Sequence, residues 1–300
     1  MNFKRIEWIF LVAFIVLDFF LMTTYFHQDS IVESTTNTST QDSTASLMKS
    51  LKNDQISHGK LSDKSQSGYY LAAPKDGFLR EKATQLRYVT WSYSNHKLTA
   101  SFITGIRLNL TNPQNSLDSV VKDAAEVPMG KHYSFNDNLS TKNTIVYTQE
   151  LYGKPVYSSE GQIRFTVKDG YVTGYTQTYI HAANILREKK DTISQKRALM
   201  WLYQYNKLPQ NSTVEWCKLG YTKLLDVNNS VVYIPTWNFC ISSKASGTVQ
   251  YRRINAFTGA VMDETIRHQW GWDVSGWRKP EAYRGGFYGY IGGESVELSS

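Results

Sequence analysis

The most apolar stretch of the chain lies near its start, from Ile6 to Phe26. A helix needs about 20 mostly apolar residues to cross a bilayer, so the pattern predicts one transmembrane helix over residues 6–26. Lys4 and Arg5 precede it, whereas residues 27–30 contain no Lys or Arg. By the positive-inside rule, we expect residues 1–5 in the cytoplasm and the rest of the chain outside the cell membrane, as a single-pass protein.

The alternative is a signal peptide that is cleaved off. Signal peptides have a shorter apolar core, of about 7–15 residues, followed by small residues at the cleavage site. Here the apolar run is longer, and Thr23-Thr-Tyr-Phe-His-Gln28 is a poor cleavage sequence. The sequence therefore favours a helix that stays in place as an anchor.

Two carboxylates interrupt this helix, Glu7 at its cytoplasmic edge and Asp18 near its middle. A central Asp costs about 2.5–3.5 kcal/mol on insertion scales, and such residues usually face another helix. Steps of three and four place six residues on one seam: Glu7, Leu11, Phe14, Asp18, Leu21 and Tyr25. A single polar residue in a seam can fix register and partner. The seam predicts contact with a partner helix, but an Asp protonated in lipid and simply tolerated there stays open, as does a second copy as partner.

Polar residues dominate the next segment, residues 27–45. Such a composition buries too little apolar surface to offset the entropy of ordering, so we expect a flexible linker. The apolar pattern then resumes in a first α+β block, residues 46–140. Within it we predict a helix over 46–53, strands over 56–61 and 69–73, and a hairpin of 87–93 with 97–103 around Asn95-His96. An apolar stripe from Leu117 to Ala125 predicts a second helix, capped by Asn115 or Ser116 and ended by residues 128–130.

A second α+β block is expected over residues 141–267. Alternating residues predict a strand over 144–149 and a hairpin of 162–167 with 171–179, turning at Asp169-Gly170. Ser194 can cap a helix that runs to Lys207. Further strands are predicted over 214–225, 231–242 and 248–257. Short polar turns between neighbouring strands favour antiparallel sheets with helices on one face, an α+β fold.

Residues 268–300 form a tail rich in glycine and aromatic residues. It could stack on sugars or lie at a membrane interface, but an irregular extension also fits its composition. The net charge of +7 could favour anionic lipids or an anionic wall polymer. The predicted location outside the membrane argues against a nucleic-acid partner.

The chain has two cysteines, Cys217 and Cys240, each within a predicted strand. An oxidising compartment would allow a disulfide between them. Two unrelated buried thiols are the alternative, since a single pair does not define a disulfide framework.

Several common catalytic motifs are absent from the sequence. We find no Gly-rich phosphate loop, no metal-binding Cys/His cluster, no His-Glu-x-x-His and no Gly-x-Ser-x-Gly. The six histidines are isolated from one another along the chain. We therefore expect neither a cofactor nor a metal, and we predict that the protein is not an enzyme, although an extracellular hydrolase with a site assembled from distant residues remains a third interpretation.

A series of short motifs, in this order along the chain, resembles the YycI family over about residues 1–262. They are Val16-Leu-Asp-Phe-Phe-Leu21, Leu61-Ser62, Gly68-Tyr-Tyr-Leu71, Gly161-Gln-Ile-Arg-Phe165, Gly174-Tyr-Thr-Gln-Thr-Tyr179, Leu208-Pro-Gln-Asn-Ser212, Leu219-Gly-Tyr221, Ile234-Pro-Thr-Trp237 and Ile254-Asn-Ala-Phe-Thr-Gly259. The last of these is also similar to small PepSY-type domains. The tail after residue 268 has no counterpart in the resemblance.

The resemblance implies a regulator of a two-component system. Together with YycH-like proteins, YycI-type proteins associate with the sensor histidine kinase (WalK/YycG type) that controls cell-wall metabolism in low-GC Gram-positive bacteria. Their transmembrane helices contact those of the kinase, and their outer part is an α+β fold. The family defines no catalytic residues. A membrane-tethered module that binds wall polymer or a protease, as PepSY-like domains suggest, is the alternative function.

Overall fold

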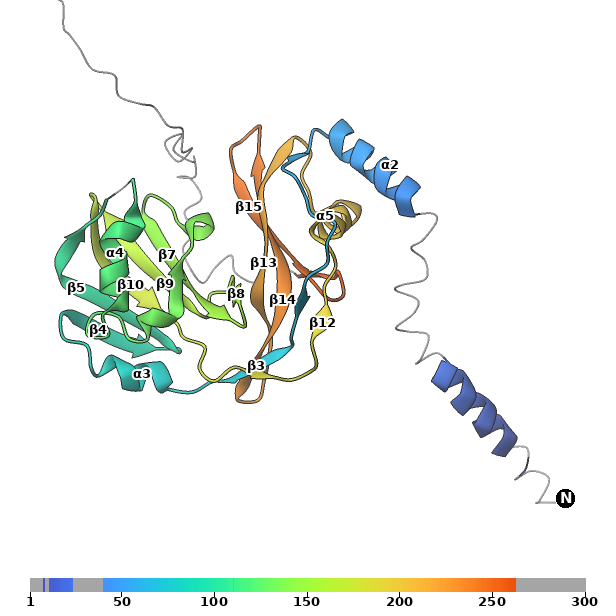
Figure 1. Cartoon of the computed structure of the whole chain (residues 1–300), viewed down its shortest axis with the longest axis horizontal. Coiled ribbons are helices and arrows are strands. Elements are labelled where there is room, and N and C mark those ends of the chain that lie inside the picture. Colours follow the sequence, from blue (N-terminus) through green and yellow to red (C-terminus); the bar gives the residue numbers. More distant parts are fainter. Residues whose placement is uncertain (1–7, 9–10, 24–39, 110, 263–300) are drawn as a thin grey trace, which may run out of the picture. The chain divides into compact units, whose positions relative to one another are not determined.

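The computed structural model describes residues 8, 11–23, 40–109 and 111–262, and Figure 1 shows their secondary structure. The chain divides into two compact units between Ile56 and Ser57. The predicted residues Lys4, Arg5, Glu7 and Tyr25 and the tail 268–300 lie outside the described residues.

The first unit contains a helix over residues 11–23 and helix α2 (Thr40–Asn53). α2 includes the predicted helix 46–53 but begins six residues earlier, so residues 40–45 of the expected linker are helical. Extending an existing helix costs little per residue, and polar residues can therefore continue it. After α2, the Ile56 amide donates to the Leu51 carbonyl oxygen over 2.9 Å and closes the helix end.

The second unit is built from two main sheets. The first, here called the framing sheet, has the order β1-β13-β14-β15-β16, with β3 paired to β14 and β11 paired to β3. Its strands are β1 (Ser57–His58), β3 (Leu71–Pro74), β11 (Asn184–Ile185), β13 (Ser212–Val227), β14 (Ser230–Ser243), β15 (Val249–Asn255) and β16 (Val261–Met262). All its pairs are antiparallel except β1 with β13. The three predicted C-terminal strands are confirmed as β13, β14 and β15.

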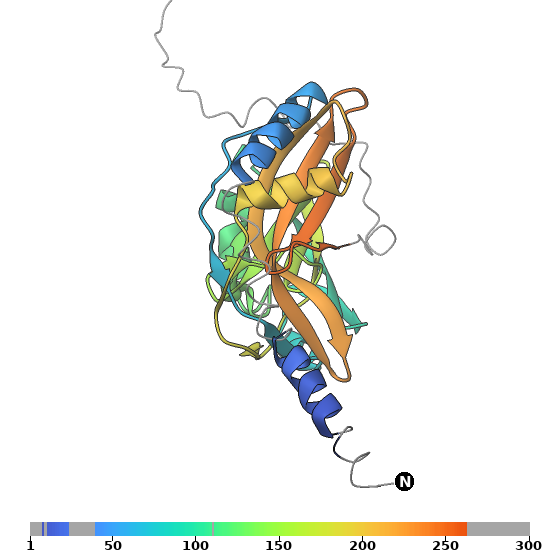
Figure 2. The ribbon, with the colours of Figure 1, turned by 90° about the vertical axis from the view of Figure 1, so that its right-hand side faces the viewer.

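Helix α5 (Gln195–Gln204) crosses one face of the framing sheet, as Figure 2 shows. The predicted cap is confirmed, because Ser194 Oγ accepts the Arg197 amide over 3.2 Å. The sequence predicts a buried stripe of Ala198, Leu199, Leu202 and Tyr205, and the helix buries the first three. Tyr205 was wrong: it follows the last residue of the helix and is 54% exposed. It is fixed to the strands through Gln195, whose Nε2 donates to the Cys217 carbonyl oxygen over 3.0 Å.

The second sheet, here called the inserted sheet, has the order β4-β5-β10-β9-β7-β6, with β8 paired to β7. Its strands are β4 (Val89–Ser94), β5 (Lys97–Arg107), β6 (Tyr133–Phe135), β7 (Thr144–Leu151), β8 (Lys154–Pro155), β9 (Gln162–Lys168) and β10 (Tyr171–Gln177). Both predicted hairpins are confirmed. Their turn residues have positive φ, 49° and 56° at Asn95 and His96 and 50° and 78° at Asp169 and Gly170, which two-residue hairpin turns require.

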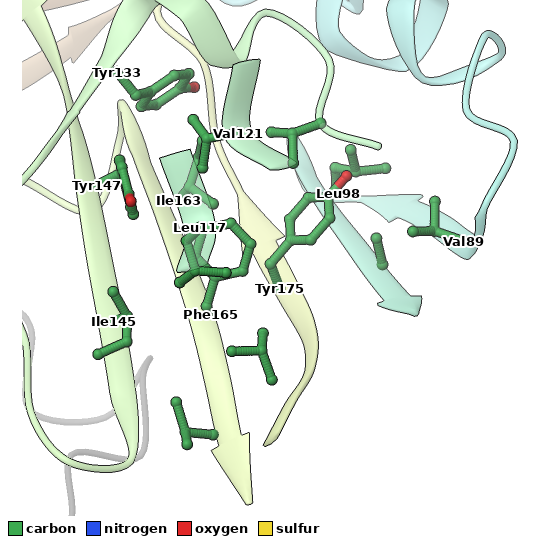
Figure 3. Close-up of a cluster of buried hydrophobic side chains, with 14 of the residues drawn as sticks. Val89, Leu98, Leu117, Val121, Tyr133, Ile145, Tyr147, Ile163, Phe165 and Tyr175 are labelled. Carbon is green, nitrogen blue, oxygen red and sulfur yellow. The ribbon is translucent and has the colours of Figure 1, made fainter. Parts of the chain in front are cut away.

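Helices α3 (Phe78–Ala83) and α4 (Pro113–Lys122) cover one face of the inserted sheet. In Figure 3, Leu117 and Val121 of α4 lie over Phe165 and Tyr175 of the strands, in the core of this sheet. The predicted cap of α4 was wrong: Asn112 caps the helix and Pro113 occupies its first turn. Proline suits that position because its fixed φ is already helical and its missing N–H would have no helical partner. The short α3 was not predicted.

Short elements complete the unit. Strands β2 (Ser67–Gly68) and β12 (Lys190–Asp191) pair with each other. The 3-10 turns η1 (Gly130–His132) and η2 (Asp137–Leu139) flank β6. The predicted strand 56–61 shrinks to the two residues of β1.

In the sequence, the segment that forms the inserted sheet lies between strands of the framing sheet. Residues 89–177 supply all its strands, while the framing sheet takes strands from both sides of that segment. The α+β class with antiparallel sheets is confirmed. The boundary expected between the blocks 46–140 and 141–267 does not separate the sheets, since β5 pairs with β10 and β3 with β14. Alternation along a strand identifies the strand but not its partner, which explains the difference.

Candidate functional site

The helix over residues 11–23 exposes apolar side chains around its whole circumference. The exposed fractions are 53% for Leu11, 62% for Phe14, 63% for Val16 and 54% for Leu21, and neighbouring positions are similar. Helices that are apolar all round are normally buried, in a protein core or in lipid. This surface therefore calls for another apolar surface to cover it. No helix within the described residues reaches the length and apolar character needed to cross a membrane.

Four of the six predicted seam residues lie in this helix: Leu11, Phe14, Asp18 and Leu21. Steps of three and four place them along one face, and all four are exposed. Asp18 lies in the middle of this row, with large apolar residues on either side. Its carboxyl group can hydrogen-bond a polar group of a neighbouring helix, and the flanking residues can pack around that bond.

A second cluster, in the second unit, was not foreseen. It gathers three histidines that are far apart in the sequence: His96, His132 and His181. His181 Nδ1 lies 2.6 Å from the Asp76 carboxylate, and His96 Nδ1 lies 3.3 Å from the Asp76 carbonyl oxygen. His132 Nδ1 lies 2.6 Å from the Tyr179 hydroxyl. The sequence gives no local sign of this cluster, because Asp76 and His181 are 105 residues apart.

Stacked aromatic rings hold the side chains of this cluster in place. Phe78 stacks on His181 with 3.8 Å between ring centroids and 6° between planes, and on Tyr179 with 5.7 Å and 25°. The ammonium group of Lys82 lies 5.1 Å from the centre of the Phe78 ring. Burial raises the pKa of Tyr179. These contacts fix the position of the His181 ring against the start of α3.

An ion-pair network lies next to this cluster, at the β13–β14 hairpin. Asp226 contacts Lys223 over 2.9 Å and Lys75 over 3.0 Å, and Lys223 also lies 3.6 Å from Glu160. The hydrogen bond from Lys223 lowers the pKa of the Asp226 carboxyl, with partial opposition from burial and further lowering by Lys75. For Lys223, burial opposes the charged form, but bonding to Asp226 and Glu160 raises its pKa overall.

The two cysteines are both buried, and they are not joined by a disulfide. They occupy paired strands, but the register places Cys217 opposite Phe239 and Cys240 opposite Trp216. Directly opposite residues share a face, so neighbouring positions 239 and 240 point to opposite faces of the sheet. The thiols therefore lie on different faces, and the alternative of two separate buried thiols describes the structure. Burial raises the pKa of Cys217 well above its usual range.

Among the residues that the structure describes, no three His, Cys, Asp or Glu side chains are grouped so that they could hold a metal ion. The histidine cluster fits this finding, because its members bond a carboxylate, a backbone oxygen and a hydroxyl rather than converge on one point.

Comparison with solved structures gives distant likenesses. An uncharacterized protein from Eubacterium rectale ATCC 33656 is 11% identical, with a TM-score of 0.44, over 70% of this chain and 91% of the other. The Bacillus megaterium YpeB C-terminal domain is 14% identical, with a TM-score of 0.34, over 75% of this chain and 96% of the other. Similarity at this level supports no conclusion about function.

No protein with a curated description matches the sequence. The model of one family, described as YycI protein, matches residues 34–257. This match covers most of the chain and confirms the resemblance noted in its motifs. The chain belongs to the YycI family.

Proposed function

We propose that this protein is a membrane-anchored regulator of a sensor histidine kinase of the WalK/YycG type, working with a YycH-like protein. Membership of the YycI family supports the regulatory role in this kinase system and is the observation that carries the proposal. Residues 6–26 anchor the chain, with the N-terminus in the cytoplasm and the α+β unit outside. The role is regulatory, and no catalytic step is assigned to the protein.

The working surface in the membrane is the seam of Glu7, Leu11, Phe14, Asp18, Leu21 and Tyr25. The exposed apolar helix with one central carboxyl group supports this assignment. Asp18 bonds a polar group of a partner helix, and the flanking residues pack around it. Interhelical hydrogen bonds in membranes contribute about 0.6–2 kcal/mol. A coupling of that size shifts a two-state kinase severalfold, which suits graded control rather than an absolute switch.

Site-specific photocrosslinking in intact cells tests the seam. A photoreactive residue at Phe14 or Leu21 should form adducts with the kinase or the YycH-like protein, whereas Val16, on the opposite face, should not. Equal labelling at all three positions would reduce the helix to a plain anchor and favour the alternative, an outer module that binds wall polymer or a protease.

Substitution of Asp18 gives an independent measurement. We expect Asp18→Leu to reduce kinase association and output severalfold, because it removes the polar contact but keeps an apolar helix. Asp18→Asn is the matched control, since its amide can still hydrogen-bond and should retain most of the association. Unchanged association and output in Asp18→Leu would refute the role of Asp18.

A further inference from the structure

The chain passes between the two sheets of the second unit at two crossovers. The first leads from β3 of the framing sheet through residues 75–77 into α3, and the second leads from β10 of the inserted sheet through residues 178–183 to β11. The Asp76 carboxylate on the first crossover meets the His181 ring on the second over 2.6 Å. This contact joins the two ends of the nested segment.

Asp76 uses both carboxylate oxygens. Oδ2 bonds His181, while Oδ1 accepts the Phe78 amide over 3.2 Å at the start of α3. The His181 ring lies flat on Phe78 at 3.8 Å between centroids. We call Asp76, Phe78 and His181 the crossover clasp. The side chains of Asp76 and His181 remain 37% and 35% exposed, so protons exchange with solvent freely.

The residue after the clasp is held in an unfavourable backbone conformation. Ala182 has a φ of 47°, in the left-handed region that residues with a Cβ rarely adopt. Its carbonyl oxygen accepts a hydrogen bond from Asn184 Nδ2 over 3.0 Å. Such conformations persist only where surrounding contacts hold them, and they are common at segments that move. The clasp and β11 hold Ala182 from its two sides.

We propose that the crossover clasp is a pH-responsive contact that sets how firmly the two crossovers are held together. Histidine ordinarily changes charge between about pH 5 and 8. A hydrogen bond between an imidazolium and a carboxylate is roughly twice as strong as its neutral counterpart. Because a charged imidazole strengthens a contact of this kind, we expect the clasp to loosen as the pH rises through that range.

The other charged and titratable groups around the clasp do not reverse this direction. Arg80 and Lys82 on α3 bring positive charge that opposes a charged imidazole, and Glu81, 3.8 Å from Lys82, offsets part of it. Lys75, which precedes Asp76, is paired with Asp226 over 3.0 Å. Tyr93 on β4 has its pKa raised by burial and then by Asp76, with Arg80 opposing, so it stays neutral throughout the histidine range. The Asp76 carboxylate is the anion in direct contact with His181.

Two further histidines lie close to the clasp. His96, in the β4–β5 turn, contacts the backbone of Asp76, and His132, in η1, bonds the Tyr179 hydroxyl. Neither contacts a carboxylate through these bonds. Their contribution is measured by His96→Gln and His132→Gln, which should leave most of the pH response in place.

Hydrogen–deuterium exchange of the full-length protein in lipid nanodiscs tests the proposal at pH 5.5 and 8.0, with rates corrected for the intrinsic effect of pH. We expect peptides covering β3, β11 and both crossovers to open about three- to tenfold more often at pH 8.0. Asp76→Asn and His181→Gln should remove this difference. His181→Lys, whose charge is fixed over this range, should keep protection high at both values.

Asp63→Asn is the matched control, because it breaks an exposed ion pair of 3.2 Å with Lys196 elsewhere in the unit. It should leave the pH response of the crossovers intact. A wild-type protein without this response, or an equal response in Asp76→Asn and His181→Gln, would overturn the proposal. Exchange in β9 and β13 reports folding, so a variant that unfolds is recognised by loss of protection there. In that case the proposal is judged by His181→Lys, whose crossovers should be protected equally at pH 5.5 and 8.0.

Discussion

At the scale of single residues, Gly259 shows how closely one position can be constrained. It follows β15 with a φ of 72°, and the ring of Trp201 from α5 occupies the space where a Cβ would lie. A side chain here is excluded twice, by backbone conformation and by overlap. The glycine thus lets the final turn of the framing sheet pack directly on α5.

We expect Gly259→Ala to lower the free energy of unfolding by roughly 2–4 kcal/mol, as the sum of a left-handed Ala and an overpacked ring. Gly247→Ala is the matched control, since its φ is 68° but no atom lies within 4 Å of the added Cβ. It should cost about 1 kcal/mol. Urea unfolding of both variants measures the difference, and equal losses would show that the ring moves aside without cost.

Asp226 gives a second prediction at this scale, on acid sensitivity. Its carboxyl pKa is lowered by Lys223, so its stabilising contribution is present above the ordinary value of 3.8 and is lost as the pH falls through the lowered value. The side chain is 41% exposed, and solvent screening limits the contribution to less than about 1 kcal/mol.

We therefore expect Asp226→Asn to reduce stability slightly at pH 7 and to make unfolding less dependent on pH below about 4. Urea unfolding between pH 3 and 7 measures this. Glu81→Gln serves as control, because its carboxylate lies 3.8 Å from Lys82 and is 76% exposed. An acid response that is the same in wild type and Asp226→Asn would show that other carboxylates dominate.

At the scale of elements, α5 depends on its first turn. Ser194 accepts the Arg197 amide, one of the N–H groups that have no partner within the helix. Ser194→Ala should cost about 1 kcal/mol, whereas Ser194→Gly should cost only a few tenths, since glycine is itself tolerated at this position. Urea unfolding of the two variants separates them. A larger loss for glycine than for alanine would mean that backbone freedom, not the cap, governs this end.

Elements with strong local signals could be predicted from the sequence. Asn95-His96 and Asp169-Gly170 marked their hairpins, and Ser194 marked the start of α5, because each signal acts within a few residues. The start of α4 was missed because a capping residue further upstream, Asn112, competes with Asn115 and Ser116. α3 is only six residues long and carries too few apolar positions to show a period.

The candidate sites also differ in whether local sequence patterns reveal them. The seam around Asp18 follows from helical spacing, so the sequence alone could suggest it. The crossover clasp could not be suggested, because Asp76 and His181 meet only when two segments 105 residues apart are brought together by the fold. The separation of Cys217 and Cys240 likewise depends on strand register, which local patterns leave open.

At the scale of the whole chain, two sheets share the second unit in a nested order. β14 pairs with β13 and β15, which are its neighbours in sequence, and also with β3, which precedes the entire inserted sheet. The nested segment thus leaves and returns to the framing sheet at adjacent points. Its two ends are held by the Asp76–His181 contact, while the Lys75–Asp226 ion pair holds the first crossover to the hairpin.

This nesting also sets an order in which the chain can acquire its structure. Every strand of the inserted sheet has been synthesised once Gln177 emerges, so that sheet can form early. β1 and β3 emerge before it, yet their partners β13 and β14 emerge only after the whole inserted sheet. Pairings between such distant segments form slowly, because a long loop must close first. Until β14 is synthesised, β3 has only the two-residue strand β11 as a partner. The period before the C-terminal strands appear is therefore when this protein is most exposed to misassembly.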